Sequence, residues 1–192
     1  LLAGLLLWGD AAALSALPAA GASPWPETMA WIRDNTAPQA RLHSFSAPNI
    51  MLWTGRSAVT SFRDVSLRDH WLAKYLHNGI EYVVLEEDAS RWEHMPGAWQ
   101  AEVYRLGVWA ASSPYVTAVF RSPADRTIVY RIQHPQPERF MKAWKLFGEA
   151  MMMRRERGPV RAKLLEAFAL EPEMECVKAA LSGAGLRPPL IP

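Results

Sequence analysis

The residues best suited to contact a phosphate or a sugar lie together at Trp53-Thr54-Gly55-Arg56. An arginine guanidinium is a planar fork that can donate two parallel hydrogen bonds to a phosphate. A tryptophan ring offers a broad apolar face on which a sugar ring can stack. Thr54-Gly55-Arg56 lacks the further glycines and the lysine of a phosphate-binding loop, so a plain turn is the simpler interpretation. If the chain binds a ligand, Arg56 and Trp53 are the candidate ligand-binding residues.

Carboxylates and histidines offer two further kinds of site. Glu86-Glu87-Asp88 follows a β-prone run, where α/β folds place ligand sites, and clustered carboxylates can hold a hard cation. A solvated acidic turn explains the same residues and is the interpretation we favour. His70 and His77 share one face of a predicted helix but lie two turns apart, too far to hold one metal ion without another ligand. We therefore predict no metal site and no cofactor, and we expect the histidines at the surface. They are His43, His70, His77, His94 and His134.

Nucleophilic catalysis has no support in the sequence. Ser44, Ser46, Ser57 and Ser61 do not stand in a Gly-x-Ser-x-Gly elbow. Cys176, the single cysteine, falls in a predicted helix without a histidine nearby in the sequence. One cysteine also excludes a disulfide framework and a cysteine-based zinc site. We predict no catalytic residue in this chain.

The composition is that of a globular domain with an unusual tryptophan content. Of 192 residues, 50% are apolar and 21% charged, which provides enough material for a core and argues against disorder. A net charge of +2, from 21 basic and 19 acidic residues, gives no nucleic-acid signature. Among nine tryptophans, we expect Trp71 and Trp144 in the core. Five others have no periodic explanation and could face a bilayer or a glycan, with core packing as the simpler alternative: Trp25, Trp53, Trp92, Trp99 and Trp109.

Residues 1–22 are predicted to form an apolar helix and a linker. The run Leu1–Trp8 stops at Gly9-Asp10 and is too short to span a bilayer by itself. No basic residue precedes it and there is no initiator methionine, so it is not an intact signal peptide. We interpret the chain as an internal fragment whose first helix is the end of a membrane helix. An amphipathic helix that packs on the domain and ends at Pro18 is a compatible alternative.

Residues 23–134 alternate between strands and helices, as expected of an α/β domain. Ser66-Leu67-Arg68-Asp69 has the spacing of an N-cap whose acidic residue can reach back to the free amides, and Asn78-Gly79 ends that helix. Tyr82–Leu85 is a continuous β-prone run, typical of a strand buried on both faces. Strand, helix and strand in this order predict a right-handed crossover in a partly parallel sheet. We expect helices at 27–34, 50–53, 66–78 and 98–106, and strands at 41–45, 57–60, 82–85, 115–120 and 127–132.

The last two predicted strands form a hairpin, because Ser122-Pro123-Ala124-Asp125 between them has good turn chemistry. The predicted fold class is therefore α/β: a small mixed sheet of about five strands with flanking helices, plus a C-terminal helical extension.

Residues 135–192 make up that extension and a tail. Apolar residues at helical spacing predict one helix up to about Arg157, and Gly158-Pro159 and Glu171-Pro172 separate it from two more. Ala167–Pro172 resembles the end of a tetratricopeptide helix pair, but no second copy follows at that period. We therefore favour a short helical cap on the α/β domain over a repeat array.

Four short segments, in order along residues 31–132, resemble one family. Trp31–Pro38 resembles the W-I-R-E-N-T-P-P segment that opens the soluble C-terminal domain of bacterial membrane glycosyltransferases of the GT-C type, relatives of dolichyl-phosphate-mannose protein mannosyltransferases. Thr54-Gly55-Arg56, Gly79–Val84 and Val129–Ile132 resemble the T-G-R, G-[IV]-x-Y-V-V and V-Y-R-[IV] segments that follow in that group.

The resemblance implies an extracytoplasmic, periplasmic domain that follows the last membrane helix of a polytopic bacterial glycosyltransferase. In that family the catalytic acidic residue lies in an early loop between membrane helices, and no part of this chain corresponds to it. The fragment is therefore expected to be a non-catalytic accessory domain that positions a lipid-linked sugar or its acceptor. Its expected partners are the membrane, through the missing N-terminal part, and a polyprenyl-phosphate sugar or glycan. The alternative is a protein-interaction module whose C-terminal helices bind a protein partner.

Overall fold

The computed structural model describes residues 23–60, 68–87, 97–155 and 160–183. Its strands are β1 (Arg41–Ser44), β2 (Ser57–Val59), β3 (Tyr82–Glu86), β4 (Val116–Ser122) and β5 (Thr127–Ile132). Its helices are α2 (Pro26–Asn35), α3 (Ala47–Thr54), α4 (Arg68–Asn78), α5 (Gly97–Ser112), α6 (Pro137–Arg155), α7 (Val160–Leu170) and α8 (Glu175–Gly183). Several sequence predictions fall outside the described residues: those for 1–22, Ser66, Asp88, Trp92, His94 and the tail from 184 onward.

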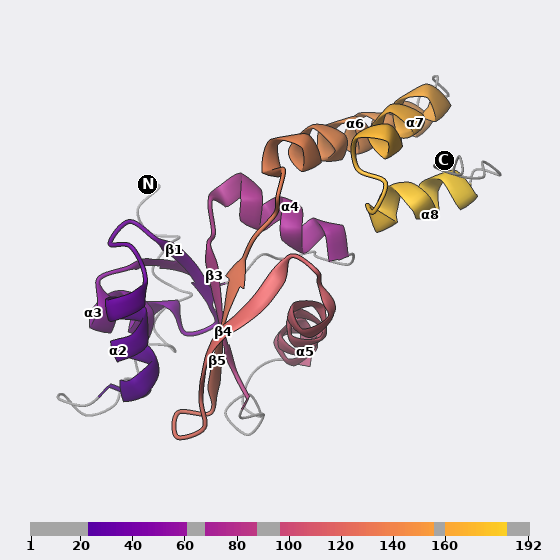
Figure 1. Cartoon of the computed structure of the whole chain (residues 1–192). Helices are drawn as coiled ribbons and strands as arrows, with labels where there is room; N and C mark the ends of the chain where they lie inside the picture. Colours follow the sequence, from indigo (N-terminus) through magenta and orange to yellow (C-terminus); the bar gives the residue numbers. More distant parts are fainter. Residues whose placement is uncertain (1–22, 61–67, 88–96, 156–159, 184–192) are drawn as a thin grey trace, which may run out of the picture.

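The five strands form one mixed sheet in the order β2-β1-β3-β5-β4. Figure 1 shows α2 and α3 on one side of this sheet and α5 on the other. Strand β1 pairs in parallel with both β2 and β3, so the connections between these strands must cross over, and they contain α3 and α4. Strand β5 pairs antiparallel with β3 and with β4. The predicted fold class, the partly parallel pairing and the hairpin are confirmed.

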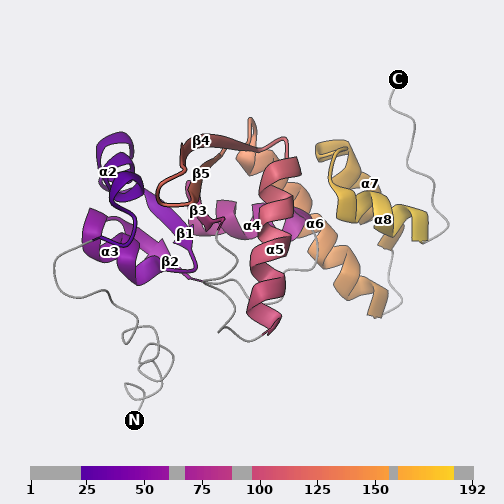
Figure 2. The same ribbon diagram turned by 90° about the horizontal axis from the view of Figure 1, so that it is seen from below.

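Helices cover both faces of the sheet (Figure 2). Neighbouring residues of a strand point to opposite faces, so each central strand supplies two separate cores. On β3, Val83 lies in the core covered by α4 and α5, whereas Val84 lies in the core covered by α2 and α3. This division explains why β3 is a continuous apolar run instead of an alternating one, as the sequence predicted.

The C-terminal helices extend the core beneath α4. Phe140 of α6, Leu164 of α7 and Val177 of α8 are buried in the same cluster as Trp71 of α4. Helix α6 contacts both α4 and α7. The helical extension therefore shares a continuous apolar core with one face of the sheet. Within the described ranges, no helix combines the length and apolar character needed to cross a membrane.

Two glycines end helices as expected, and one helix is longer than expected. Gly55 follows α3 with a φ of +68°, and Gly79 follows α4 with a φ of +62°. Both lie in the left-handed region that glycine adopts without strain.

Helix α5 runs to Ser112 instead of stopping at Leu106. Trp109 and Ala110, which follow Leu106 by three and four residues, are buried, so they continue the same packed face for another turn.

Two buried carboxylates bind the first amides of helices that are distant in sequence. Asp125, in the turn before β5, accepts a hydrogen bond of 2.7 Å from the backbone N–H of Thr28 in α2. Asp69 accepts one of 2.7 Å from the backbone N–H of Cys176 in α8. The first N–H groups of a helix have no partner inside the helix, and the dipole there favours a negative charge. Asp69 was expected to cap its own helix, but its described bond joins α4 to α8.

His43 is buried in the centre of the sheet, which corrects the expectation of surface histidines. The carbonyl of Thr60 lies 3.2 Å from His43 Nε2 and can only accept, so Nε2 carries the proton. Nδ1 then accepts a bond of 2.8 Å from the hydroxyl of Tyr75. Burial lowers the pKa of His43 from 6.5 to about 4, because the charged form is poorly solvated there.

Removing the cap on α2 should destabilise the fold. We expect Asp125→Ala to lower the free energy of unfolding by about 1–2 kcal/mol, since it leaves a first-turn amide without its partner. Asp34→Ala is the matched control, because the Asp34 side chain is 64% exposed, and it should change stability by less than about 0.5 kcal/mol. Urea unfolding followed by circular dichroism measures both. Equal stability of the two variants would contradict the capping role.

The neutral His43 should make stability depend on pH. The unfolded chain takes up a proton at His43 near pH 6.5, whereas the folded chain resists it until about pH 4. The contribution of His43 is therefore complete above pH 6.5 and falls by about 3 kcal/mol as the pH drops to 4. His43→Gln cannot titrate and should lose this part of the pH dependence. Urea unfolding between these pH values tests it, and identical profiles for the two proteins would contradict it.

Candidate functional site

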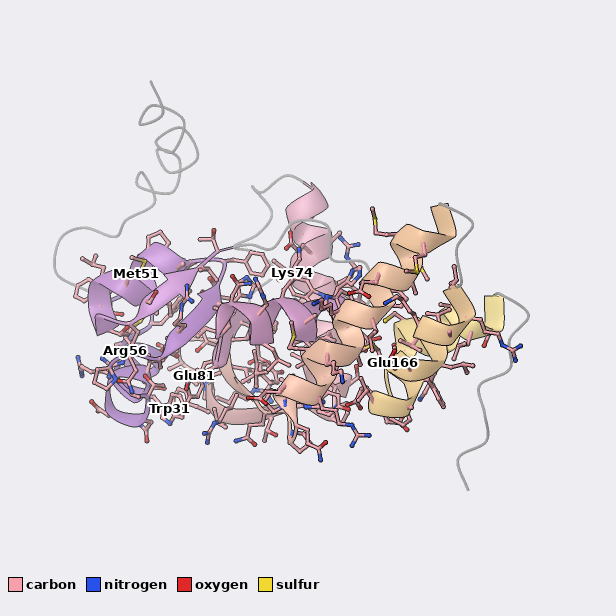
Figure 3. All side chains as sticks on the ribbon, turned by 90° about the horizontal axis from the view of Figure 1, so that it is seen from above. Trp31, Met51, Arg56, Lys74, Glu81 and Glu166 are labelled. Atoms are coloured by element: carbon pink, nitrogen blue, oxygen red, sulfur yellow. The ribbon has the colours of Figure 1, made fainter. Side chains whose placement is uncertain are left out.

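The candidate residue Arg56 binds the C-terminal end of α2. Its Nη2 donates to the carbonyl of Arg33 at 2.8 Å and to that of Thr36 at 2.9 Å. Its Nε donates to Thr36 Oγ1 at 3.1 Å, and its Nη1 donates to the carbonyl of Thr54 at 3.2 Å. The last carbonyls of a helix lack partners inside it and attract a cation. Figure 3 shows Arg56 at the end of the molecule formed by α2 and α3.

These bonds limit what Arg56 can do for a ligand. A guanidinium has five N–H groups, and these four bonds use Nε–H, one Nη1–H and both of the Nη2–H groups. A phosphate could meet only the remaining Nη1–H without breaking a contact to α2. Phosphate binding by Arg56 stays a prediction. The role that its bonds show is to bind the C-terminal end of α2.

Trp53 is half-buried at the end of α3, where it packs against the core beneath α2 and α3. Its indole Nε1 is buried and has no hydrogen-bond partner among the described residues. Its neighbours Met51 and Leu52 are exposed, at 51% and 66%. Trp53 therefore offers a sugar only part of its ring, and the predicted stacking role also stays a prediction.

The carboxylates at the end of β3 have partners. Ser46 Oγ donates a bond of 3.0 Å to Glu86, and Glu87 forms an ion pair with Arg121. Within the described part of the chain, no group of three or more histidine, cysteine or acidic side chains could hold a metal ion. Glu86 is the last residue of β3 and half-buried, and Asp88 lies outside the described residues, so the solvated acidic turn stays a prediction.

Cys176 is unsuited to act as a nucleophile. Its side chain is buried beside Asp69, and burial together with that carboxylate raises the pKa of the thiol far above its ordinary value. A thiol attacks as the thiolate, which this environment disfavours. Its place is structural, at the start of α8.

A groove that was not predicted from the sequence lies between α5 and the sheet. The groove has a volume of about 680 Å³. Tyr104 and Val108 stand one helical turn apart on α5 and are 73% and 44% exposed. Neither Arg56 nor Trp53 lines the groove. The groove is lined by Leu85, Glu86, Glu87, Gln100, Val103, Tyr104, Gly107, Val108, Ala111, Ile128 and Tyr130.

The sequence does contain a signal for this groove. Leu106, Trp109 and Ala110 form the buried face of α5, yet Tyr104 and Val108 add apolar residues on another side. A helix that only packs on a core is polar on its remaining faces. Apolar residues outside the core face therefore indicate that α5 has a second face suited to contact with another molecule.

The four family-like segments meet in two pairs. Arg56 of Thr54-Gly55-Arg56 bonds to Arg33 and Thr36 of the first segment. Strands β3 and β5, which contain the other two, lie side by side in the sheet, with Val83 opposite Tyr130. The residues that carry the resemblance therefore lie in contacts that hold the fold together.

Replacing Arg56 should destabilise the protein even without a ligand. We expect Arg56→Gln to lower the free energy of unfolding by about 2 kcal/mol, because three carbonyls lose a charged donor. Arg56→Lys should recover only part of the loss, since an ammonium cannot reproduce the planar fork. Arg33→Gln is the control and should change little, because that side chain is 57% exposed. If Arg56→Gln is as stable as the control in urea unfolding, the helix-binding role is wrong.

Comparison with known proteins adds a likeness in structure. No protein-family model matches the chain, and no curated protein matches it. Among solved structures it is similar to the C-terminal globular domain of an oligosaccharyltransferase from Archaeoglobus fulgidus, at 13% sequence identity and a TM-score of 0.36. The match covers 60% of this chain and 100% of that one. A likeness at this identity and TM-score carries no inference about what this chain does.

Proposed function

We propose that the chain is a non-catalytic, extracytoplasmic domain of a polytopic membrane glycosyltransferase, where it positions a lipid-linked sugar or the acceptor. The observation that carries the proposal is the meeting of the four family-like segments. Arg56 ties the T-G-R segment to the end of α2, and the other two segments pair as β3 and β5. The residues that this chain shares with the family hold the fold together. They therefore support the same kind of domain in both, but they imply no reaction in it.

The chemistry of the described residues supports the non-catalytic part of the proposal. A group that transfers protons or attacks a sugar carbon must reach substrate and change its charge near neutral pH. His43 is buried, with a pKa lowered to about 4, so it stays neutral and out of reach. Cys176 is buried and held as the thiol.

The alternative, a protein-interaction module that uses the C-terminal helices, has less support. The apolar faces of α6, α7 and α8 are occupied, since Phe140, Leu164 and Val177 are buried in the core shared with α4. A helix that docks a partner through an apolar groove leaves that face open. Met152 of α6 is the exposed large apolar side chain on these helices, among the described residues.

A turnover assay tests the proposal. The purified chain, given a polyprenyl-phosphate sugar and an acceptor, is expected to transfer no sugar, because the proposed catalytic groups belong to the membrane part. The complete gene product in membrane vesicles is the positive control and should transfer sugar. Transfer by the purified chain would overturn the proposal, and so would a complete gene that encodes no membrane-spanning helices before this domain.

A further inference from the structure

The groove beside α5 has the size and lining of a small-molecule site. Leu85, Ile128 and Tyr130 come from β3 and β5, and Val103 and Val108 come from α5. Its volume of about 680 Å³ falls within the range of known ligand sites, roughly 300–1,000 Å³. The groove lies between α5 and the sheet. Figure 2 shows α5 beside the sheet.

Tyr104 gives the groove an exposed aromatic face. Its side chain is 73% exposed, although it lines the groove together with Val108 one turn further along α5. Large aromatic rings usually bury most of their surface in the core or in a contact with a partner. A flat ring that is apolar on its face and carries a hydroxyl at its edge suits the C–H face of a sugar ring, whose edge is also polar.

Gly107 of α5 lines the groove and has no side chain that could fill it. A Cβ added at Gly107 would meet no described atom within 4 Å, and its backbone does not adopt a positive φ. Neither packing nor backbone geometry in the described structure therefore requires glycine here. A glycine inside a helix destabilises it by about 0.5–1 kcal/mol relative to alanine. Gly148 inside α6 has the same properties, so the glycine alone does not indicate a site; its consequence is that a larger side chain at position 107 would occupy part of the groove.

The charges at the groove favour hydroxyl groups over phosphate. The charged side chains that line it in the described structure are the carboxylates Glu86 and Glu87, and Gln100 adds an amide. Carboxylates accept strong hydrogen bonds from hydroxyl donors, and they repel an anion. Ser46 and Arg121 hold the two carboxylates in place, so their positions are set before a ligand arrives. Arg121 offsets the charge of Glu87, but the described lining contains no cation of its own that could meet a phosphate. Such a lining suits a neutral sugar better than the phosphate end of a lipid-linked donor.

We propose that this groove binds the neutral sugar units of a glycan, with Tyr104 stacking on a sugar ring and Glu87 and Gln100 accepting hydrogen bonds from its hydroxyls. The inference rests on the proposed function, since it names the part of the lipid-linked sugar or acceptor that this domain would hold. The proposed sugar site is the groove beside α5, and neither Arg56 nor Trp53 lines it.

Nuclear magnetic resonance titration of the ¹⁵N-labelled chain tests the site. The probes are neutral linear tetrasaccharides of glucose, of mannose and of N-acetylglucosamine, each at millimolar concentration. At least one should shift the amide signals of Tyr104, Gly107 and Ile128 together. Inorganic pyrophosphate and a cationic amphipathic peptide form the comparison arms and should leave these signals in place.

Two pairs of variants make the test specific. Gly107→Leu fills the groove and should weaken saccharide binding by at least about tenfold. Gly148→Leu is its control, because Gly148 also lies inside a helix, α6, and a Cβ there also meets no atom within 4 Å. Tyr104→Ala should weaken binding by about tenfold, whereas Met152→Ala, at an apolar side chain that is 57% exposed on α6, should not.

The outcomes separate this inference from the proposed function. The inference is overturned if none of the tetrasaccharides shifts the groove signals, if Gly107→Leu binds as well as Gly148→Leu, or if pyrophosphate or the peptide occupies the groove instead. None of these results bears on the turnover assay, which measures sugar transfer by the purified chain and not binding in the groove. Sugar transfer by the purified chain would remove the proposed function and leave the binding site measurable by the same titration.

Discussion

The placement of α2 depends on charged side chains at both of its ends. Asp125 binds the N–H of Thr28 at the start of the helix, and Arg56 binds the carbonyls of Arg33 and Thr36 at its end. Both contacts match the sign of the helix dipole and satisfy backbone groups that the helix leaves without partners. They join three distant parts of the chain: the β4–β5 turn, the α3–β2 connection and α2 itself. The two contacts fix the ends of the helix, and its buried side chains Met29 and Ile32 pack in the core on that face of the sheet.

The other face is held by burial. Its core runs from the sheet through α4 and α5 to the three C-terminal helices, and Asp69 of α4 binds the backbone N–H of Cys176 in the first turn of α8. His43 is buried on this face as a neutral side chain, and both of its ring nitrogens form hydrogen bonds inside the protein. His43 and Cys176 therefore have structural roles in the described part of the chain. Among the described residues, the groove beside α5 is a large opening on this face of the sheet.

Much of the fold is readable from local sequence, while its long-range contacts are not. The buried run at Tyr82–Leu85 and the glycines after α3 and α4 act within a few residues, and the structure has them as predicted. The burial of His43 depends on Tyr75, which is distant in sequence, and the partner of Asp69 depends on α8. The candidate site was predicted from Arg56 and Trp53 by residue type alone. The groove needed both the sheet and α5 in place, since its lining comes from three separate segments.

The central claim is that this domain holds a sugar in its groove while the membrane part performs the transfer. Photocrosslinking in the complete membrane protein tests it most directly, with a photoreactive residue in place of Tyr104 of α5 and, as control, in place of Met152 of α6. The account predicts that a radiolabelled lipid-linked sugar or its glycan product crosslinks to position 104 and not to position 152. Equal labelling at both positions, or labelling at neither while the enzyme remains active, would contradict it.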